Sequence, residues 1–360
     1  MHICVVGLGN IGFNLLTYLV EEFPGEVTGV DINGQRIAEI QELGFKVTSD
    51  YQTLNAIDTW VLTPSTGNHG QTIFAVLDAM LIHPGSLISI ESTLPPGTME
   101  RVKNYLSQKG FTLGRDCFLI HVPHRVMFGI DKTVCDTPRV MGAFTEACLE
   151  KGRKFYGPLV PGLIEVEEVR IAELSKVVEN VKRYIDVAFA QEMYRYCVNQ
   201  GINFQGLRRA VNSKENVELL SPDWGVGGEC LPKDMSFLRA VFNSPLLEGA
   251  EQGDRLYQEE IIKRVGSGRR VLLKGLSYKP GLKDLEHSRG VDLVRGLEEG
   301  GNFVMVEEPL FTPDELVAKG FTPFEPTMRN ELQGAGNTRE MPEVILERSK
   351  PLEGIILKPE

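Results

Sequence analysis

Hydrophobic and polar positions alternate in short blocks along the first half of the chain. Residues 3–6 form an apolar run rich in β-branched side chains, and after a glycine-rich segment residues 13–22 carry apolar side chains at helical spacing. The same two kinds of block then recur: they predict strands over 26–30, 59–63 and 86–90, helices over 35–43 and 71–80, and shorter apolar pieces at 118–122 and 138–141. Strands that alternate with helices predict an α/β protein with a doubly wound parallel sheet.

The pattern changes near residue 167. Residues 167–200 contain no proline or glycine and repeat their apolar positions at near-helical spacing, which predicts one long helix. Shorter helices are expected up to about residue 264. The later blocks predict a strand–loop unit at 270–276, a helix over 291–299, a strand over 302–306 and an irregular segment over 326–351.

These changes of pattern predict three domains. They are an α/β domain over residues 1–166, a central helical domain over 167–264, and a shortened C-terminal α/β domain over 265–360. Apolar side chains such as Val178 and Phe189 spread around much of the long helix, and a helix that is apolar on more than one face needs a second partner. We expect a homodimer built on residues 167–200, since twofold dimers are the commonest soluble oligomers. Alternatively, the third domain covers that face within one chain.

Composition excludes several classes of protein. Of 360 residues, 42% are hydrophobic and 24% charged, which excludes a disordered chain. The net charge of −11 argues against a nucleic-acid partner, because phosphate binding needs a basic face. No apolar run approaches the roughly 20 residues of a membrane span. The N-terminus resembles no signal peptide, and the six cysteines are scattered without metal-ligand spacing, so we expect a cytoplasmic protein with reduced thiols and no metal.

Gly7, Gly9 and Gly12 form the pattern G-x-G-x-x-G directly after the first strand. In this context the pattern favours a Rossmann-type dinucleotide site, where the glycines allow a tight turn, close approach of the pyrophosphate and helix packing. Asp31 ends the second strand and would bind a ribose diol, which favours NAD over NADP, although the nearby Arg36 leaves some use of NADP open. A purely structural glycine turn is the alternative.

Two polar loops follow later strands, at residues 63–66 and 91–97. Loops at the carboxyl ends of parallel strands border the ligand crevice of such a sheet. Their hydroxyl groups can bind a cofactor or position a water, or they can be simple polar turns. The predicted cofactor-binding residues are Gly7, Gly9, Asn10, Ile11, Gly12, Asp31, Arg36, Thr63, Pro64, Ser65 and Thr93.

Residues 225–234 place three glycines around Cys230 and end at Asp234. Pro232 favours a helix start there, and a helix N-terminus stabilises a reactive thiolate. A buried core cysteine is the alternative. Lys176 and Asn180 lie four residues apart on one face of the long helix, where they can stabilise an oxyanion.

The ordered set of motifs resembles the UDP-glucose/GDP-mannose dehydrogenase family over about residues 1–310. The matching segments are 7–12 with Asp31, 91–97, 172–176 with Asn180, 227–234, and 275–280 with Asp284 and Ser288. The resemblance implies that two NAD molecules take two hydrides from C6 of a nucleotide-sugar substrate, converting an alcohol to a carboxylate. It also implies that Cys230 holds the aldehyde as a thiohemiacetal and then as a thioester.

The same resemblance implies roles for further residues. Lys176 and Asn180 would stabilise the oxyanions, Asp234 and Thr93 would hold a water, and Lys279 would reach a sugar hydroxyl or the reacting oxygen. The implied catalytic residues are Cys230, Lys176, Asn180, Asp234, Thr93 and His124, and the implied substrate-binding residues are Lys176, Asn180, Gly227 and Lys279.

The chain departs from the family pattern in two motifs. His124 stands where the family typically has the glutamate of Pro-Glu-Arg, and an imidazole can also accept a proton. Glu286 stands where an arginine is expected near the cofactor phosphates, and Arg289 is a substitute displaced by three positions. Two other functions stay open: a single oxidation of the β-hydroxyacid dehydrogenase type, and binding of NAD or a nucleotide sugar without turnover.

Overall fold

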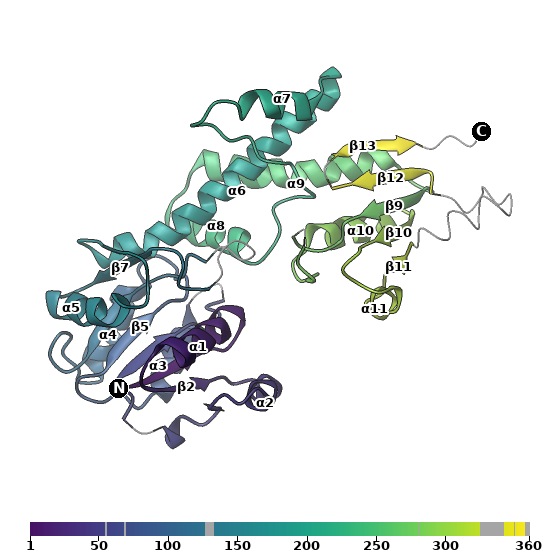
Figure 1. The fold of residues 1–360 in the computed structure, drawn as a ribbon. Coiled ribbons are helices and arrows are strands. Elements are labelled where there is room, and N and C mark those ends of the chain that lie inside the picture. The colour runs from purple at the N-terminus through teal and green to yellow at the C-terminus, as the bar shows by residue number, and fades with distance from the viewer. Residues whose placement is uncertain are drawn as a thin grey trace. The chain divides into compact units, whose positions relative to one another are not determined.

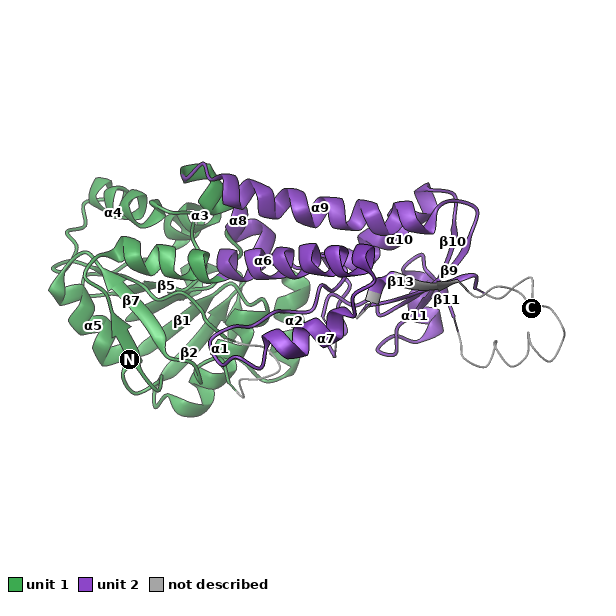
Figure 2. Ribbon diagram, turned by 90° about the horizontal axis from the view of Figure 1, so that it is seen from above, with its two compact units in different colours: residues 1–179, 236–241 green, residues 180–235, 242–360 purple. Residues whose placement is uncertain are grey.

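The computed structural model describes residues 1–54, 56–67, 70–126, 133–279, 281–324, 342–348 and 350–356 (Figure 1). The chain divides into two compact units, which Figure 2 colours separately. Unit 1 consists of residues 1–179 and 236–241, and unit 2 of residues 180–235 and 242–360. The three-domain division expected from the sequence stays a prediction.

Unit 1 is built on an eight-stranded sheet with the order β3-β2-β1-β4-β5-β6-β7-β8. All neighbouring strands are parallel except β6 and β7, so the predicted parallel sheet carries one antiparallel pair. The elements are β1 (His2–Val6), α1 (Asn10–Glu22), β2 (Glu26–Val30), α2 (Gly34–Glu42), β3 (Val47–Thr48), the 3₁₀ turn η1 (Tyr51–Thr53), β4 (Thr59–Leu62), α3 (Gln71–Ala79), β5 (Leu87–Ile90), α4 (Thr98–Gln108), β6 (Phe118–His121), β7 (Arg139–Ala143), α5 (Glu146–Tyr156) and β8 (Leu163–Glu165).

The apolar run of β1 is buried on both faces of this sheet. Ile3 and Val5 pack in one hydrophobic cluster with residues of α1, α2 and α5, whereas Cys4 and Val6 pack in another with residues of α3 and α4. A parallel strand covered on both faces reads as a continuous apolar run, which is why the sequence pattern was recognisable. The strand order reverses between β1 and β4, and ligands of open α/β sheets bind at the carboxyl ends of such strands.

Helix α6 (Val169–Gln200) confirms the long helix expected from the sequence. Val177 and Val181 are buried, but the side chains of Val178 and Phe189 are 49% and 56% exposed. Apolar residues therefore do occupy more than one face of α6. The homodimer built on them stays a prediction.

Unit 2 contains a second sheet of five strands, in the order β11-β10-β9-β12-β13. Its hydrophobic cluster includes Tyr194, Phe204, Trp224 and Tyr257. The remaining elements are α7 (Phe204–Val211), α8 (Cys230–Val241), α9 (Pro245–Val265), β9 (Arg270–Lys274), α10 (Arg289–Glu299), β10 (Phe303–Glu307), α11 (Pro313–Ala318), β11 (Thr322–Pro323), β12 (Val344–Glu347) and β13 (Lys350–Ile356).

The expectation that residues 326–351 are irregular is wrong where β12 and the start of β13 lie. Strand β12 pairs in parallel with β9 and antiparallel with β13. Its four residues are too few for a periodicity that can be recognised in the sequence, and their strand partner comes from a segment about seventy residues away in the chain. Residues 326–341 and Ser349 lie outside the described residues. No described helix combines the length and the apolar composition that a membrane crossing requires.

Candidate active site

The glycine motif forms the turn between β1 and α1. Gly7 has φ +89°, and a Cβ there would lie 2.6 Å from the backbone of Pro64. A Cβ on Gly12 would lie 1.8 Å from the carbonyl oxygen of Gly7, so α1 packs against the turn only because both residues lack side chains. A Cβ on Gly9 would meet no atom within 4 Å. Helix α1 begins with Asn10 and Ile11, and no described side chain caps its first N–H groups.

Asp31 and Arg36 both bind the backbone of Leu8, inside the glycine turn. Asp31 Oδ2 accepts from the N–H of Leu8 at 2.6 Å, and Arg36 Nε donates to the carbonyl oxygen of Leu8 at 3.0 Å. The Arg36 guanidinium also lies 4.8 Å from the centroid of the Phe13 ring and pairs with Glu39 at 3.2 Å. Arg36 is therefore anchored to the same backbone segment as Asp31 and paired with a second carboxylate.

Hydrogen bonds join the glycine turn to the loops that follow β4 and β5. Thr63 Oγ1 donates to the carbonyl oxygen of Gly7 at 2.8 Å, and Ser92 Oγ donates to that of Pro64 at 2.6 Å. Thr66 Oγ1 donates to the carbonyl oxygen of Thr93 at 2.8 Å. The structure thus brings the predicted residues Thr63, Pro64 and Thr93 to one edge of the sheet, while the neighbouring Ser65 is exposed.

Lys176 lies in the part of α6 that belongs to unit 1. Glu173, almost one turn earlier, accepts from the backbone N–H groups of Met99 at 2.7 Å and of Gly97 at 3.2 Å. These bonds tie α6 to the segment that follows Thr93. Lys176 and Thr93 are both partly buried.

A buried cluster that the sequence analysis did not single out surrounds His124. Oε2 of Glu91, at the end of β5, contacts His124 Nε2 and accepts from Arg139 Nη1 at 3.1 Å. Its other oxygen, Oε1, accepts from the Tyr156 hydroxyl at 2.5 Å. Glu91 and Arg139 are each only 1% exposed and His124 is 7% exposed. Glu91 and Arg139 lie at the ends of apolar strands. A charged residue in such a position was the only sign in the sequence that this cluster exists.

The protonation states of this cluster follow from its charges. Burial alone would raise the pKa of the Glu91 carboxyl, but His124, Arg139 and the Tyr156 hydroxyl together lower it to about 2. Burial, and then the charge of Arg139, lower the pKa of His124 to about 4, with a smaller contribution from Lys176. At neutral pH Glu91 is therefore a carboxylate and His124 is a neutral imidazole.

In unit 2, Cys230 is the first residue of α8, in agreement with the helix start expected near Pro232. It is exposed, whereas the other five cysteines are buried. Asp234 follows one helical turn later, and its Oδ2 accepts from Asn180 Nδ2 at 2.5 Å. Three predicted residues from two distant helices, Cys230, Asp234 and Asn180, are thus brought together.

The glycines before Cys230 make room for other side chains rather than for the thiol itself. A Cβ on Gly228, which has φ +80°, would lie 2.5 Å from the Tyr278 ring. A Cβ on Gly227 would lie 3.0 Å from Cγ of Arg289. Burial, together with the neighbouring Cys230, raises the pKa of the Tyr278 hydroxyl. Tyr278 is therefore a neighbour of the thiol that the sequence analysis missed, while Lys279 is exposed.

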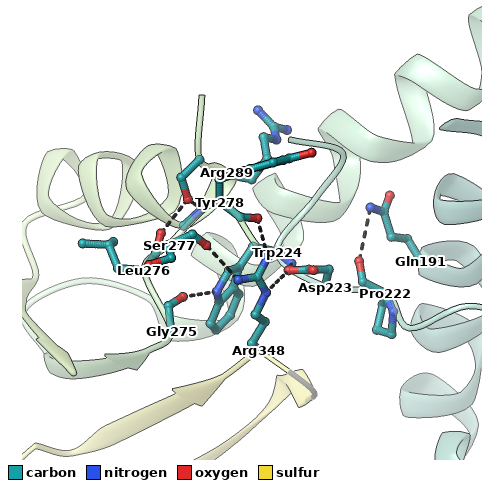
Figure 3. A network of polar contacts seen from close by, with 12 residues as sticks. Gln191, Pro222, Asp223, Trp224, Gly275, Leu276, Ser277, Tyr278, Arg289 and Arg348 are labelled. Carbon is teal, nitrogen blue, oxygen red and sulfur yellow. Dashed lines mark hydrogen bonds and ion pairs between the residues drawn. The ribbon is translucent and has the colours of Figure 1, made fainter. Parts of the chain in front are cut away.

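Two arginines hold the segments around the cysteine loop. Arg289 pairs with Asp254 and Asp292, both at 3.1 Å, so this proposed substitute for a phosphate-binding arginine already has two carboxylate partners. Arg348 donates to Asp223 at 2.5 Å and to the carbonyl oxygens of Ser277 and Tyr278 at 2.7 and 2.6 Å (Figure 3). Trp224 Nε1 donates to the carbonyl oxygen of Gly275 at 2.6 Å, beside these contacts.

The strand order, the glycine turn and Asp31 define a Rossmann-type α/β fold, a class of fold in which ligands bind at this edge of the sheet. The open space at Gly9 and the uncapped start of α1 fit the pyrophosphate of a dinucleotide. In the same chain, an exposed cysteine at a helix start lies near an amide and a buried carboxylate.

Comparison with known proteins identifies the family. The pattern of the UDP-glucose/GDP-mannose dehydrogenase family, central domain, matches residues 170–250. The chain is 31% identical over 336 residues to a UDP-N-acetyl-D-mannosamine dehydrogenase of Methanocaldococcus jannaschii, covering 83% of this chain and 77% of that one. It is 28% identical over 350 residues to an NDP-N-acetyl-D-galactosaminuronic acid dehydrogenase of Ralstonia nicotianae, covering 85% and 82%.

A solved structure agrees with these relatives. The UDP-N-acetyl-mannosamine dehydrogenase of Staphylococcus aureus superposes with a TM-score of 0.80 at 26% identity, covering 98% of this chain and 95% of that one. The chain belongs to the UDP-glucose/GDP-mannose dehydrogenase family, which confirms the resemblance seen in its motifs. It is accordingly an oxidoreductase that acts on CH–OH groups.

Proposed function

We propose that this protein oxidises a nucleotide-diphosphate sugar at C6 from alcohol to carboxylate, with NAD as the hydride acceptor and Cys230 as the nucleophile. The observation that carries the proposal is the position of Cys230. It alone among the six cysteines is exposed, it begins α8, and Asp234, one helical turn later, accepts a hydrogen bond from Asn180 of α6. A single oxidation to a ketone or aldehyde would need no such nucleophile. The names of the relatives favour a UDP-linked N-acetylhexosamine as the substrate.

The residues of unit 1 would bind the cofactor. The turn at Gly7 and Gly9 and the first N–H groups of α1 would hold the pyrophosphate, and Asp31 would bind the ribose diol. When bound, NAD accepts a hydride from C6 in each of the two oxidations. The carboxylates of Asp31 and Glu39 beside Arg36 support NAD over NADP.

In the first oxidation, His124 accepts the proton of the C6 hydroxyl as the hydride leaves, which produces an aldehyde. The thiolate of Cys230 then attacks the aldehyde carbon and forms a C–S bond. Lys176 and Asn180 stabilise the oxyanion that results. Loss of a second hydride gives a thioester. A water held by Asp234 and Thr93 attacks this thioester, the C–S bond breaks, and the acid leaves while the thiol is restored.

The stoichiometry of NADH release tests the proposal. The protein is incubated with NAD and, one at a time, with UDP- and GDP-linked hexoses and N-acetylhexosamines, and NADH is counted for each sugar consumed. Two NADH per sugar support the proposal. One per sugar indicates a single oxidation of the β-hydroxyacid dehydrogenase type, and none with any sugar indicates a binding protein without turnover.

We also propose a cytoplasmic location and a homodimer built on α6. The reduced state expected for the cysteines supports the location, because the proposed chemistry needs a free thiol at Cys230. The exposed side chains of Val178 and Phe189 support the dimer.

A further inference from the structure

The cluster of Glu91, His124 and Arg139 contains charged groups buried in the interior of unit 1. Removing a carboxylate and a guanidinium from water costs several kcal/mol for each ion unless their partners compensate. Here the compensation is nearly complete on the carboxylate: one oxygen binds Arg139 and His124, and the other accepts from Tyr156. The Tyr156 hydroxyl lies in turn 2.7 Å from Ser89 Oγ. Strand β7, helix α5 and the loop after β6 thus each supply one partner to the single side chain of Glu91.

The contact between Glu91 and His124 decides which imidazole nitrogen carries the proton. A carboxylate only accepts hydrogen bonds, so the nitrogen that faces it, Nε2, must be the N–H of the neutral ring. The lone pair of the imidazole then resides on Nδ1. Both ring nitrogens are buried and neither makes a hydrogen bond of regular geometry among the described residues, but Nε2 contacts the Glu91 carboxylate and Nδ1 is given no such contact. A buried acceptor without a partner is costly and calls for an explanation.

The charged and titratable groups around the imidazole keep this arrangement at neutral pH. Arg139 and Tyr156 hold Glu91 as an anion, and burial with the charges of Arg139 and Lys176 keeps His124 neutral. A further neighbour, His121 on β6, is fully buried, and its Nδ1 lies 2.8 Å from the carbonyl oxygen of Ile90. Burial also lowers the pKa of His121, to about 4, so it adds no charge to the cluster at neutral pH.

We propose that Glu91 is a positioning residue that holds His124 in its Nε2–H tautomer, so that Nδ1 is the atom that takes the proton of the substrate hydroxyl. This proposal rests on the proposed function. The O–H bond of the substrate breaks, its proton moves to Nδ1, the C=O bond forms, and the hydride leaves to NAD. His124 becomes an imidazolium, which the anionic Glu91 stabilises, and it later returns the proton to water. Arg139 acts one step further away, by holding Glu91 in place.

A merely structural role predicts different behaviour. If the cluster only ties β5 to β7 and to the loop after β6, a loss at Glu91 would act on folding and would add to any loss at His124. If Glu91 acts through His124, its substitution has nothing left to impair once the imidazole is gone. A double-mutant cycle separates the two cases.

The experiment compares Glu91→Gln, His124→Asn and the double variant in the full-length protein, with the sugar that releases NADH in the substrate panel. Loss of a general base lowers kcat by about 100-fold or more, so we expect this for His124→Asn. Glu91→Gln keeps the size of the side chain and should lower kcat at least about tenfold, with little change in KM for NAD. The double variant should match His124→Asn alone.

A matched control removes a carboxylate that has similar partners at the surface. Asp78 accepts from Tyr105 and pairs with Lys109 at 3.0 Å, but its side chain is 59% exposed. Asp78→Asn should leave kcat unchanged. If Glu91→Gln does not fold, Glu91→Asp keeps a negative charge in the cluster but withdraws it by one methylene from the imidazole of His124, and the same loss without additivity is expected.

A second measurement does not depend on turnover. In protein labelled with nitrogen-15 histidine, the His124 signals, assigned by their absence in His124→Asn, should show a neutral Nε2–H ring at neutral pH. Glu91→Gln should shift them toward a mixture of tautomers. An Nδ1–H ring or an imidazolium in the wild type, multiplicative losses in the cycle, or a Glu91→Gln kcat within twofold of wild type would each overturn the proposal. Failure of the proposed function shows separately, as a wild type that does not release two NADH per sugar.

Discussion

The contact between Gly228 and Tyr278 makes a sharp quantitative prediction about the loop that carries Cys230. Gly228→Ala introduces two penalties. Its φ of +80° costs a residue with a Cβ about 1–2 kcal/mol, and the new Cβ would lie 2.5 Å from the Tyr278 ring. Overpacking of a filled site costs about a further 1–3 kcal/mol. Together the two penalties should lower the free energy of unfolding by about 2–5 kcal/mol.

Gly301 provides the matched control in the same unit. It also has φ +80°, but a Cβ there would meet no atom within 4 Å. Gly301→Ala should therefore cost only the backbone penalty of about 1–2 kcal/mol. The difference between the two alanine variants isolates the contact with Tyr278.

The assay is equilibrium unfolding in urea, followed by tryptophan fluorescence. Trp224 is buried in unit 2 and bonded to Gly275, so a Trp60→Phe background common to all variants restricts the signal to this unit. Adding Tyr278→Ala should reduce the cost of Gly228→Ala to that of Gly301→Ala. Equal costs at the two glycines while Tyr278 is present would refute the steric argument.

Four further predictions concern the cysteine, the cofactor, the oligomer and acid stability. Cys230→Ala should abolish formation of the sugar acid but keep NAD binding in calorimetry, and acid formation near the wild-type rate would exclude covalent capture. Asp31→Ala should weaken NAD binding and raise the relative use of NADP, because the ribose contact and the repulsion of a 2′-phosphate disappear together; an unchanged ratio of kcat/KM values would reject that role. Sedimentation equilibrium should give twice the 40.1 kDa of one chain, and Phe189→Glu on the exposed face of α6 should give the monomer mass; a wild type of 40.1 kDa contradicts the dimer. Burial lowers the pKa of His121 and His124 from 6.5 to about 4. Between these two pH values the unfolded chain binds more protons than the folded one. The free energy of unfolding should therefore be highest above pH 6.5 and fall as the pH drops toward 4. In urea titrations across this range His124→Asn should show a smaller fall, and an equal fall would contradict the assignment.

Local signals in the sequence were sufficient for most elements of the fold. The run at residues 3–6 is apolar because β1 is covered on both faces, and the long helix is recognisable because 32 residues repeat one period without a break. The glycine motif and Pro232 at the start of α8 are equally local signals, although the residues that pack against these glycines come from distant segments. These features can therefore be predicted from the local sequence without knowledge of the tertiary structure.

The partners of buried polar groups were decided only by the tertiary structure. Glu91, His124 and Arg139 are separated by up to 48 residues, and nothing in their neighbourhoods indicates that they meet. The same holds for the Tyr278 ring on Gly228 and for β12 beside β9. Periodicity reports which side of an element is buried, but not what lies against it. A buried charge is stable only beside a compensating group. In this protein the compensating group comes from another strand end, which the strand order of the sheet brings to the same edge.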